Sequence, residues 1–541
     1  MKLSFSTLEE MLSAFDVIDA DQVSSPEPGT MLIVRNIRTF KQWSLVPLSD
    51  LNLFTGPNSS GKSTIIDVLK FFFTRKTDDL EHFNTAGRIV VGFSSGWKEF
   101  AEWDMRDPLL QKRFPLSSMM NFVDSLEGVS SSVYKTRFRR FTWLMEVWPG
   151  DDGQCWGIYV FGDQRCLGQF VSGGSAENFF ALRIMPELYV GRSNERFEKT
   201  VTKTLESMPK FIKFNMGQDA SDLCYETSQS FPPGEPMYIA SGSNDFDFDE
   251  GPYLAFDDDS DISEIKALLV LTFNWFYLPI RIVEKGLKPV SFVPALRSIP
   301  TSGQLEFLNI SERMDFSEKR FPEQRIYEEI ARALIKNKSK YLTEVNAWLT
   351  KLLATDYALD GVVKKIVERR SSASEANKKK KIDARYSVKL HLTVGNDLKL
   401  GFADVGTGVS QVVPVVALLL SLDDDDPAVL QQPELHLHPK AQSVLADLFL
   451  TVCSRGHQIT IETHSEHIIL RIIRRLGERG SRGNQSAFIN PSQLRIVYFH
   501  PGPNGSEPHW IRVDDAGRFL DPWPAGFFEE RYEDLFFERS L

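Results

Sequence analysis

The chain has 541 residues, a formal net charge of −11 at pH 7, and enough hydrophobic residues (42%) to fill more than one core. This length favours two or three domains, and the negative charge argues against a protein coated with nucleic acid, although a local basic patch stays open. No apolar run approaches the roughly 18 residues of a membrane helix, and the acidic, mixed N-terminus is unlike a signal peptide. The four cysteines lack metal-binding spacing, and together these features indicate a cytoplasmic protein without membrane contact.

The first 75 residues predict an N-terminal extension followed by the beginning of an α/β core. Residues 1–30 contain one predicted helix and a linker rich in Ser, Pro and Gly. Residues 31–75 alternate strand-like runs and then enter an amphipathic helix, with a Gly-rich loop directly before it. This order of strand, loop and helix is the context in which a phosphate-binding loop works.

The Gly-rich loop is a complete P-loop, and its residues are Gly56, Pro57, Asn58, Ser59, Ser60, Gly61, Lys62, Ser63 and Thr64. The backbone N–H groups of residues 58–63 would converge on the α- and β-phosphates of a nucleotide at the helix N-terminus. Lys62 would reach the β- and γ-phosphate oxygens, and the Ser63 hydroxyl would bind Mg²⁺. The loop therefore predicts a site for ATP with Mg²⁺, against the alternative of an ordinary Gly-rich turn.

Residues 76–285 lack ATPase motifs and predict a large inserted α+β domain between the two parts of the core. The stretch is rich in aromatic residues and contains strand-like runs at 141–147 and 156–161. It ends in an acidic segment at 244–261, which we expect to be a loop.

Residues 286–475 predict the second part of the core, and residues 476–541 predict a short C-terminal domain. Apolar residues recur at helical spacing over 321–353. A basic, low-complexity segment at 369–385 precedes a strand expected at 386–394.

A Gly/Ser-rich loop at 401–411 follows, and its small residues at a helix N-terminus suit anion binding. An apolar helix is expected at 412–422, and a short buried strand at 428–430.

Four further motifs follow the P-loop, and together with it they carry a resemblance. They are Val293-Pro-Ala-Leu-Arg297, Asp404-Val-Gly-Thr-Gly-Val-Ser-Gln411, Gln432-Pro-Glu-Leu-His-Leu-His-Pro439 and Glu462-Thr-His-Ser-Glu-His467. With them the chain resembles the ABC-class ATPases of the RecF/OLD-like, SMC-related branch. It is most similar to the subgroup with a short uncharacterised domain after the switch histidine and no TOPRIM nuclease domain. The resemblance implies an α/β fold with a mixed sheet, in which the insert lies between the P-loop and the signature motif.

The resemblance also implies a head-to-tail homodimer that holds two ATP molecules between its protomers. Residues 404–411 match the signature loop that caps the γ-phosphate of the other subunit. His464 matches the switch histidine, which contacts the γ-phosphate, and His438 falls in the loop that crosses the dimer interface. The alternative is that these residues form ordinary turns and a core histidine. The expected contacts of the signature loop come from Gly406, Gly408, Ser410 and Gln411.

Two glutamines stand where most such enzymes have acids. Gln431 occupies the position of the acid that holds the Mg²⁺ shell, and Gln432 that of the glutamate that polarises water, although glutamine is usual there in this subgroup. An amide matches a carboxylate in shape but carries no charge for a metal ion and cannot accept a proton. We therefore expect ATP binding with impaired hydrolysis, whether Gln431 is natural or engineered. Glu434 is the only carboxylate of this segment left to act as a base, unless its role is purely structural.

Two basic features are candidates for contacts with nucleic-acid phosphates. One is the lysine run Lys378–Lys381. The other is a predicted helix face formed by Arg471, Arg474, Arg475 and Arg479. The alternative, which we favour, is a solvated loop and a solvated helix face.

Three functions fit these features. The first is an ATP-dependent dimeric molecular switch in bacterial anti-phage defence or DNA maintenance, which acts with a separate effector protein such as a nuclease. The second is a hydrolysis-deficient scaffold that binds ATP and assembles an effector complex. The third is a DNA-end-binding repair ATPase, which the net acidity and the lack of heptad repeats weaken. We expect a homodimer or a higher oligomer.

Overall fold

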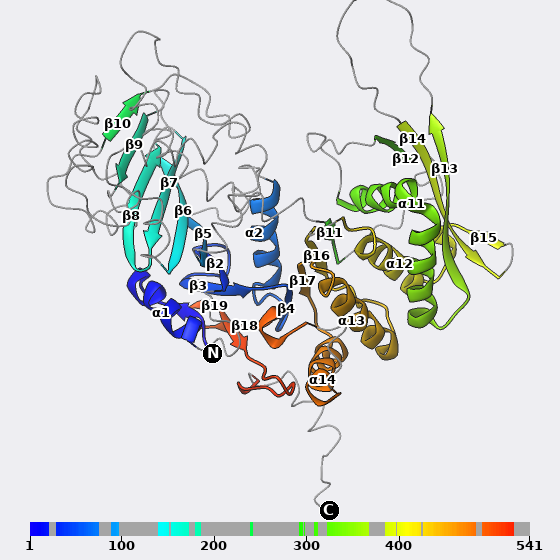
Figure 1. Cartoon of the computed structure of the whole chain (residues 1–541). Helices are drawn as coiled ribbons and strands as arrows, with labels where there is room; N and C mark the ends of the chain where they lie inside the picture. The colour runs from blue at the N-terminus through cyan, green and yellow to red at the C-terminus, as the bar shows by residue number, and fades with distance from the viewer. Residues whose placement is uncertain are drawn as a thin grey trace, which may run out of the picture.

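The computed structural model has a central α/β core flanked by two further sheets (Figure 1). It describes residues 1–20, 29–74, 88–96, 139–150, 153–172, 179–184, 238–241, 291–295, 297, 308–311, 322–366, 385–395, 398–423, 426–482 and 489–523. Several sequence predictions lie outside the described residues. They include the acidic loop at 244–261, nearly all of the basic segment at 369–385 with the lysine run Lys378–Lys381, and the side chain of Arg479.

A six-stranded mixed sheet forms the centre of the core, in the order β11-β16-β17-β4-β18-β19. The first five strands are parallel, and β19 is antiparallel to β18. The central strands are short, apolar and buried, as expected for parallel strands covered on both faces. The predicted mixed sheet and the strand predicted at 428–430 are therefore confirmed. The strand bounds are β4, Leu51–Thr55; β11, Ser291–Val293; β16, Ala428–Gln431; β17, Ile459–Glu462; β18, Leu494–Gly502; and β19, Gly505–Ile511.

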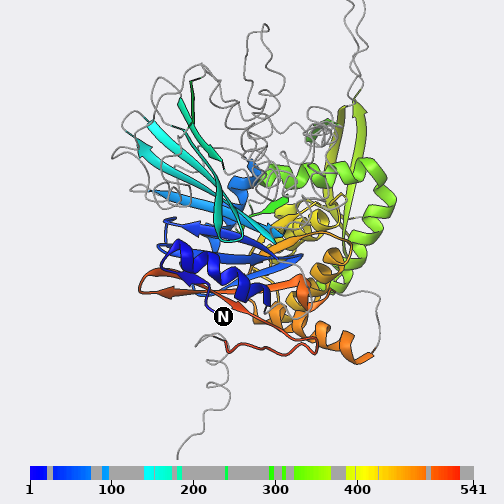
Figure 2. The ribbon, with the colours of Figure 1, turned by 60° about the vertical axis from the view of Figure 1, so that its left-hand side comes forward.

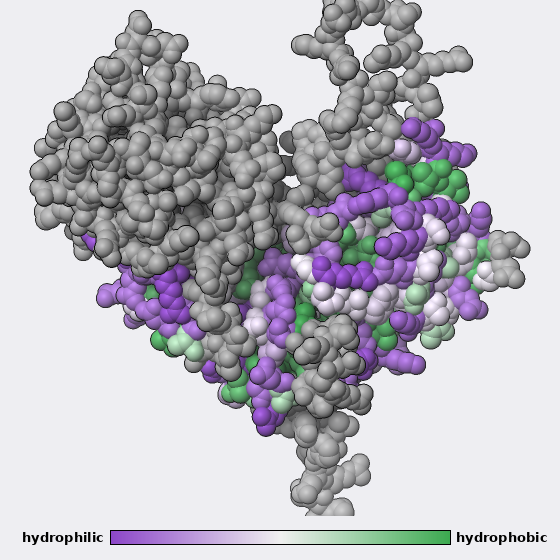
Figure 3. Space-filling model, viewed as in Figure 1, coloured by the Kyte–Doolittle hydropathy of each residue, from purple (hydrophilic) through white to green (hydrophobic). Residues whose placement is uncertain are grey.

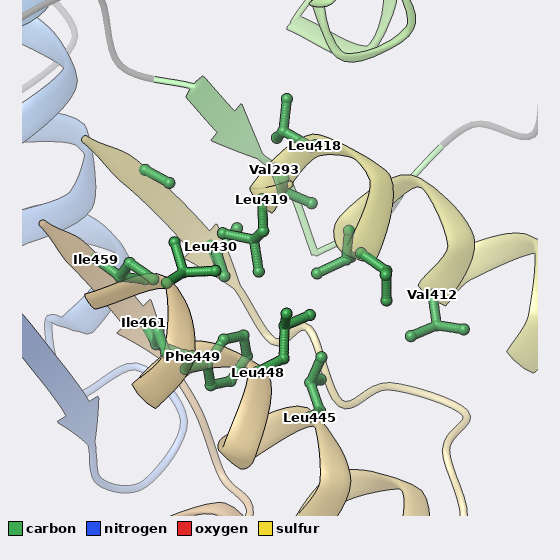
Figure 4. Close-up of a cluster of buried hydrophobic side chains, with 14 of the residues drawn as sticks. Val293, Val412, Leu418, Leu419, Leu430, Leu445, Leu448, Phe449, Ile459 and Ile461 are labelled. Atoms are coloured by element: carbon green, nitrogen blue, oxygen red, sulfur yellow. The ribbon is translucent and has the colours of Figure 1, made fainter. Parts of the chain in front are cut away.

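Helices cover both faces of this sheet, and alternate strand residues belong to two different hydrophobic cores. Phe54 and Val429 pack in the core that contains α2, whereas their neighbours Leu53 and Leu430 pack in the core that contains α12, α13 and α14. Figure 4 shows the second core, where side chains of α12 and α13 meet β16 and β17. Each fully buried aliphatic side chain stabilises such a core by about 1.5–3 kcal/mol. α2 and α12 therefore lie on opposite faces of the sheet. The helix bounds are α2, Lys62–Thr74; α12, Thr407–Leu419; α13, Pro439–Cys453; and α14, Glu466–Arg482.

A nine-stranded antiparallel sheet shares the core of α2, in the order β1-β3-β2-β5-β6-β7-β8-β9-β10. Figure 2 shows β6 to β9, in cyan, extending this sheet beyond β2 and β3, in blue. The runs predicted at 141–147 and 156–161 are confirmed as parts of β6 and β7. The long inserted region therefore continues a sheet that begins in the ATPase core. The strand bounds are β1, Ser4–Phe5; β2, Thr30–Arg35; β3, Trp43–Leu48; β5, Ile89–Gly96; β6, Arg140–Gly150; β7, Gly153–Gly162; β8, Arg165–Ser172; β9, Phe179–Ile184; and β10, Tyr238–Ser241.

Helix α1 (Leu8–Ala20) packs against the beginning of the antiparallel sheet through an apolar face. A capping box starts the helix, because Thr7 Oγ1 accepts a hydrogen bond from Glu10 N and the Glu10 carboxylate accepts bonds from the backbone before the helix. Near its end, Asp19 is buried and forms an ion pair with Arg140 of β6, with 2.5 Å between Oδ1 and Nη2. This pair fastens the N-terminal helix to the inserted region.

Helix α11 (Pro322–Leu353) and a four-stranded sheet form another part of the described chain. The helix confirms the prediction for 321–353 and kinks at Asn337, whose φ of −158° and ψ of 80° are not helical. Strand β14 (Arg385–Val394) confirms the strand predicted at 386–394. It pairs with three strands, β12, Leu308–Ser311; β13, Tyr357–Ile366; and β15, Leu398–Leu400.

Helix α12 begins at Thr407, five residues earlier than the predicted start, and ends at Leu419. Gly406 is its N-cap residue, so part of the Gly/Ser-rich loop forms the first helical turns. The prediction was wrong at this boundary because Gly and Ser are poor helix formers, and tertiary packing overrides that preference here. Short 3-10 helices, η2 (Phe402–Asp404) and η3 (Pro491–Gln493), precede α12 and β18.

The surface seen in Figure 3 is mostly hydrophilic over the described residues, with hydrophobic side chains in small separate patches. Within the described ranges, no helix is both long enough and apolar enough to span a membrane. Cys166 and Cys453 are buried free thiols.

Candidate nucleotide-binding site

Three neighbouring parallel strands end side by side, and their carboxyl ends carry the predicted ATPase residues. β4 leads into the P-loop, β16 ends at Gln431, and β17, which lies between them, ends at Glu462. Gln431 and Glu462 are in register across the two strands. In open α/β sheets, ligands bind outside this edge. The fold therefore gathers the P-loop, residues 431–434 and residues 462–464 at one place.

The P-loop backbone is tight and requires glycine at two positions. Gly56 has a φ of +137° and Gly61 a φ of +101°, which side-chain-bearing residues rarely adopt. A Cβ on Gly61 would lie 2.6 Å from Ser506 Oγ and 2.8 Å from the Phe40 ring. A Cβ on Gly56 would meet the carbonyl oxygen of Phe499. The loop is thus held closely against β18 and β19.

The middle of the P-loop faces outward. Pro57, Asn58 and Ser59 are exposed, and Ser59 has a φ of +61°. Ser60 is buried, and so is Thr64 in the first turn of α2. The exposed backbone at the helix N-terminus is therefore the part of the loop that an anion can approach.

Lys62 lies beneath the loop and is only 3% exposed. Its ammonium donates to the carbonyl oxygens of Gly56 (3.0 Å) and Pro57 (2.7 Å) and lies 3.5 Å from Ser60 Oγ. Burial lowers the pKa of Lys62, and the charge of Glu462 only partly opposes this. Among the described residues it has no ion-pair partner, so a phosphate group would complete its environment.

Ser63, the next residue, contacts the end of β17. Its hydroxyl donates to both carboxylate oxygens of Glu462, at 2.9 and 3.2 Å. The side-chain amide of Gln431 donates to the same carboxylate at 3.0 Å. Glu462 is 4% exposed, so a buried carboxylate lies between the two predicted Mg²⁺ residues. Sequence reasoning missed Glu462, although it opens one of the quoted motifs.

Glu434 is buried and joins the segment after β16 to the segment after β17. Its Oε1 accepts hydrogen bonds from Thr463 Oγ1 and from the backbone N–H of His464, both at 2.8 Å. Burial raises the pKa of Glu434, although these bonds and the charge of Arg297 lower it in part. Its Oε2 has no hydrogen-bond partner among the described residues. Glu434 therefore has a structural role and also one buried oxygen without a hydrogen-bond partner among the described residues.

His464, the predicted switch histidine, has an exposed side chain at the same edge. Partial burial lowers the pKa of His464, the charge of Lys62 lowers it further, and Glu462 opposes the shift. The neighbouring Ser465 accepts a bond from Ile468 N (3.1 Å) at the start of α14 and donates to Gln442 of α13 (2.6 Å). The backbone next to His464 is thus fixed on both sides while the ring stays accessible.

The predicted signature loop is only partly exposed. Gly406 is exposed and has open space where a Cβ would lie, whereas a Cβ on Gly408 would lie 2.8 Å from the carbonyl oxygen of His436. Ser410 and Gln411 are buried, and the Ser410 hydroxyl donates to the Thr407 carbonyl at 3.0 Å. Because α12 lies on the opposite face of the sheet from α2, the fold does not bring this loop onto the P-loop of the same chain.

Arg297 connects α12, here called the signature helix because it begins in the signature loop, to the segment after β16. Sequence reasoning missed this role. Its guanidinium donates to the carbonyl oxygens of Gln411 (2.6 Å) and Gln432 (3.0 Å), and the Gln411 amide donates back to the Arg297 carbonyl at 2.9 Å. Burial lowers the pKa of Arg297 to about 10, against the charge of Glu434. Gln432 itself has a φ of +42°, which is uncommon for a residue other than glycine.

His438 is exposed and is the N-cap residue of α13, where its Nδ1 accepts from Lys440 N at 3.3 Å. The predicted interface loop is therefore accessible in the single chain. No group of three or more His, Cys, Asp or Glu side chains suited to a metal ion occurs in the part of the chain that the structure describes.

The predicted basic face of α14 is largely neutralised inside the protein. Arg471 and Arg475 both donate to the carboxylate of Asp447 on α13, with N–O distances between 2.7 and 3.0 Å. Arg474 and Arg475 also pair with Glu478 at 2.8 Å. Arg471 and Arg475 join α14 to α13, whereas Arg474 pairs within α14 and is exposed. The proposed phosphate-binding face is therefore not a free basic patch.

Two protein-family descriptions match this chain. An AAA ATPase domain matches residues 298–469, and an AAA domain matches residues 32–99. The two matches cover the two parts of the predicted core on either side of the inserted region. The chain therefore has the α/β fold of a P-loop ATPase with a mixed sheet, as predicted. The RecF/OLD-like subgroup stays a prediction.

Solved structures of SMC head domains are similar to this chain at a distant level. The SMC head domain from Thermotoga maritima is 12% identical with a TM-score of 0.30, over 89% of this chain and 98% of that chain. An Smc head domain bound to the C-terminal domain of ScpA from Pyrococcus furiosus is 9% identical with a TM-score of 0.35, over 89% and 96%. These scores are too low to transfer a function. No curated protein shows significant similarity to the chain.

Proposed function

We propose that this chain is an ATP-dependent molecular switch that binds ATP with Mg²⁺ at the P-loop edge and closes as a head-to-tail homodimer. The observation that carries the proposal is the convergence of the P-loop, Gln431, Glu462 and His464 at the ends of three adjacent parallel strands. The exposed loop residues 57–59, the α2 N-terminus and the buried ammonium of Lys62 together suit a polyphosphate.

The separation of the two anion-binding elements supports the dimer. The P-loop begins α2 on one face of the sheet, and the signature loop begins α12 on the other. A second copy arranged head to tail would bring its signature loop to the γ-phosphate that the first copy leaves uncovered. Nucleotide would then stabilise the dimer because it contacts both chains.

Hydrogen bonds within one chain suggest how the switch is transmitted. Arg297 joins the signature helix to Gln432, and Glu434 joins the segment after Gln432 to the backbone of His464. A ligand that moves the signature helix would therefore act on the residues beside its own P-loop. A switch needs such a coupling between two sites, whereas a fold that only binds ATP does not need it.

The two glutamines favour one alternative, a scaffold that binds ATP without turning it over. Gln431 and Gln432 cannot accept a proton, which leaves Glu434, with its unpartnered Oε2, as the base of this segment. A setting in anti-phage defence or DNA maintenance, with a separate effector, rests on the resemblance alone.

The experiment is a sedimentation measurement of oligomeric mass with and without ATP, together with ATP turnover. We expect ATP to raise the mass to twice the 61.6 kDa of one chain. Gly406→Glu is the matched control, since the position is exposed with open space around it, and its charge would repel the γ-phosphate of the other chain. That variant should bind ATP and stay monomeric. A mass that does not respond to bound ATP would contradict the switch, and turnover by Gln431→Glu alone would show that Gln431 traps the ATP state.

A further inference from the structure

Glu462 has an environment that a purely structural carboxylate rarely has. It is 4% exposed at the end of β17, yet it accepts hydrogen bonds only from neutral groups, the Ser63 hydroxyl and the Gln431 amide. No lysine or arginine among the described residues forms an ion pair with it. The charge of Lys62 acts on this carboxylate without a direct contact, so burial leaves it incompletely compensated and the position favours the arrival of a cation.

The donor set at Glu462 matches the preference of Mg²⁺. This ion prefers hard oxygen ligands and is usually held by one or two carboxylates together with waters and substrate phosphates. Ser63 is the hydroxyl that a P-loop directs at Mg²⁺. Its oxygen lies 2.9 Å from Glu462 Oε1, so the carboxylate lies at the metal side of the loop. One carboxylate and one hydroxyl, with ATP oxygens, are enough for such a site.

The register of the strands explains why a carboxylate on β17 can replace one on β16. Gln431 of β16 and Glu462 of β17 are paired positions at the ends of adjacent parallel strands. Their side chains are in contact, with 3.0 Å between Gln431 Nε2 and Glu462 Oε2. A carboxylate at the end of β17 can therefore reach nearly the same ligand position as a carboxylate at the end of β16.

We propose that Glu462 supplies the anionic oxygen ligand for the Mg²⁺ of bound ATP, in place of an acid at position 431. Gln431 acts as a positioning residue, because its amide N–H holds one carboxylate oxygen and leaves the other beside Ser63. The inference rests on the proposed ATP site and deepens it. The site therefore keeps one negative charge for Mg²⁺, on Glu462, although the side chain at position 431 is neutral.

The test is the affinity for ATP measured by calorimetry in Mg²⁺ and again in EDTA, with wild type, Glu462→Gln, and the charge-swap variant Gln431→Glu/Glu462→Gln. We expect Mg²⁺ to tighten binding to wild type by about tenfold or more, and Glu462→Gln to lose most of this gain while its affinity in EDTA is unchanged. The charge-swap variant has the composition of the wild type and should recover the gain. If Glu462→Gln does not fold, the charge-swap variant by itself still tests the proposal.

Three outcomes overturn the inference, and they differ from failure of the ATP site itself. A full Mg²⁺ gain in Glu462→Gln would show that this carboxylate does not ligate the ion. A charge-swap variant that binds ATP without any gain would contradict the shared position of residues 431 and 462 from which the proposal is argued. If wild type binds ATP no better than Lys62→Ala in either buffer, the ATP site is wrong and the inference falls with it. Binding in EDTA that depends on Lys62, without a Mg²⁺ gain in wild type, would overturn the inference alone.

Discussion

Two groups of buried charges in this chain differ in how they are satisfied. Asp19 and Arg140 face each other with side chains 2% and 3% exposed, and the guanidinium also donates to the Gly29 carbonyl and the Ser94 hydroxyl. At the P-loop edge, the buried Lys62 and Glu462 make their hydrogen bonds only to neutral groups.

The difference separates a structural ion pair from a binding site. Where both charges and nearly all donors are satisfied, as at Asp19 and Arg140, a ligand has nothing to add. Where a buried cation and a buried anion lie near each other without pairing, the fold carries an electrostatic cost that phosphate and Mg²⁺ would remove. This contrast leads to four predictions.

The largest expected effect is on stability, at the structural pair. Asp19→Ala leaves Arg140 buried without its anion and should lower the free energy of unfolding by about 3–5 kcal/mol, measured by chemical denaturation. Glu9→Ala, an exposed position on the same helix, should cost far less. ATP affinity of the folded Asp19→Ala protein should stay at the wild-type value, and a parallel loss of affinity would remove the distinction between the two groups.

The next effect is on ligand binding, at the P-loop edge. Lys62→Ala removes charge-assisted hydrogen bonds to phosphate and should weaken ATP binding by about 1.5–3 kcal/mol, roughly tenfold to a hundredfold, in a fluorescence titration. Lys70→Ala, which removes a lysine from the same helix, should bind ATP normally. Stability without nucleotide should not fall in Lys62→Ala, since no ion pair is broken. A large loss of stability in Lys62→Ala would show that Lys62 stabilises the fold, as Asp19 and Arg140 do, and would contradict its assignment to a binding site.

A pH-dependent effect is expected at Glu434. Because burial raises its pKa, the folded protein binds more protons than the unfolded chain between the ordinary value of 4.5 and the raised value. Stability therefore falls as pH rises through this window. Glu434→Gln lacks this loss, so its melting temperature relative to wild type should increase as pH rises above 4.5 through this window. A difference that is constant with pH would contradict the buried, ionisable state of Glu434.

The smallest effect is expected at the partly exposed cluster of Asp447, Arg471 and Arg475 between α13 and α14. Asp447→Asn weakens two arginine contacts and should lower stability by about 1 kcal/mol, because solvent screens these charges. Binding of double-stranded DNA should not depend on Arg471, which is engaged by Asp447. A steep loss of DNA affinity in Arg471→Ala, compared with the more exposed Arg474→Ala, would restore the nucleic-acid interpretation of this face.

Local signals in the sequence were enough to predict the P-loop, since Gly56, Gly61 and Lys62 obtain their roles from a strand, a turn and a helix that follow one another. They also placed α11 and β14. Glu462 was not predicted, because its role depends on β17 lying between β16 and β4, which brings it to Ser63, 399 residues away in the sequence. Arg297 was missed for the same reason, since the acceptors through which it joins the two segments, the Gln411 and Gln432 carbonyls, are 114 and 135 residues away. The continuation of the core sheet into β6 and β7 likewise depends on long-range pairing that periodicity does not contain.

The most direct test of the central claim is a calorimetric titration of the wild-type chain with ATP in the presence of Mg²⁺. The unpaired charges of Lys62 and Glu462 predict saturable binding of one ATP per chain, together with a rise in melting temperature that follows occupancy. A folded protein that takes up no ATP at millimolar concentration, with an unchanged melting temperature, would contradict the account of this edge as a nucleotide site.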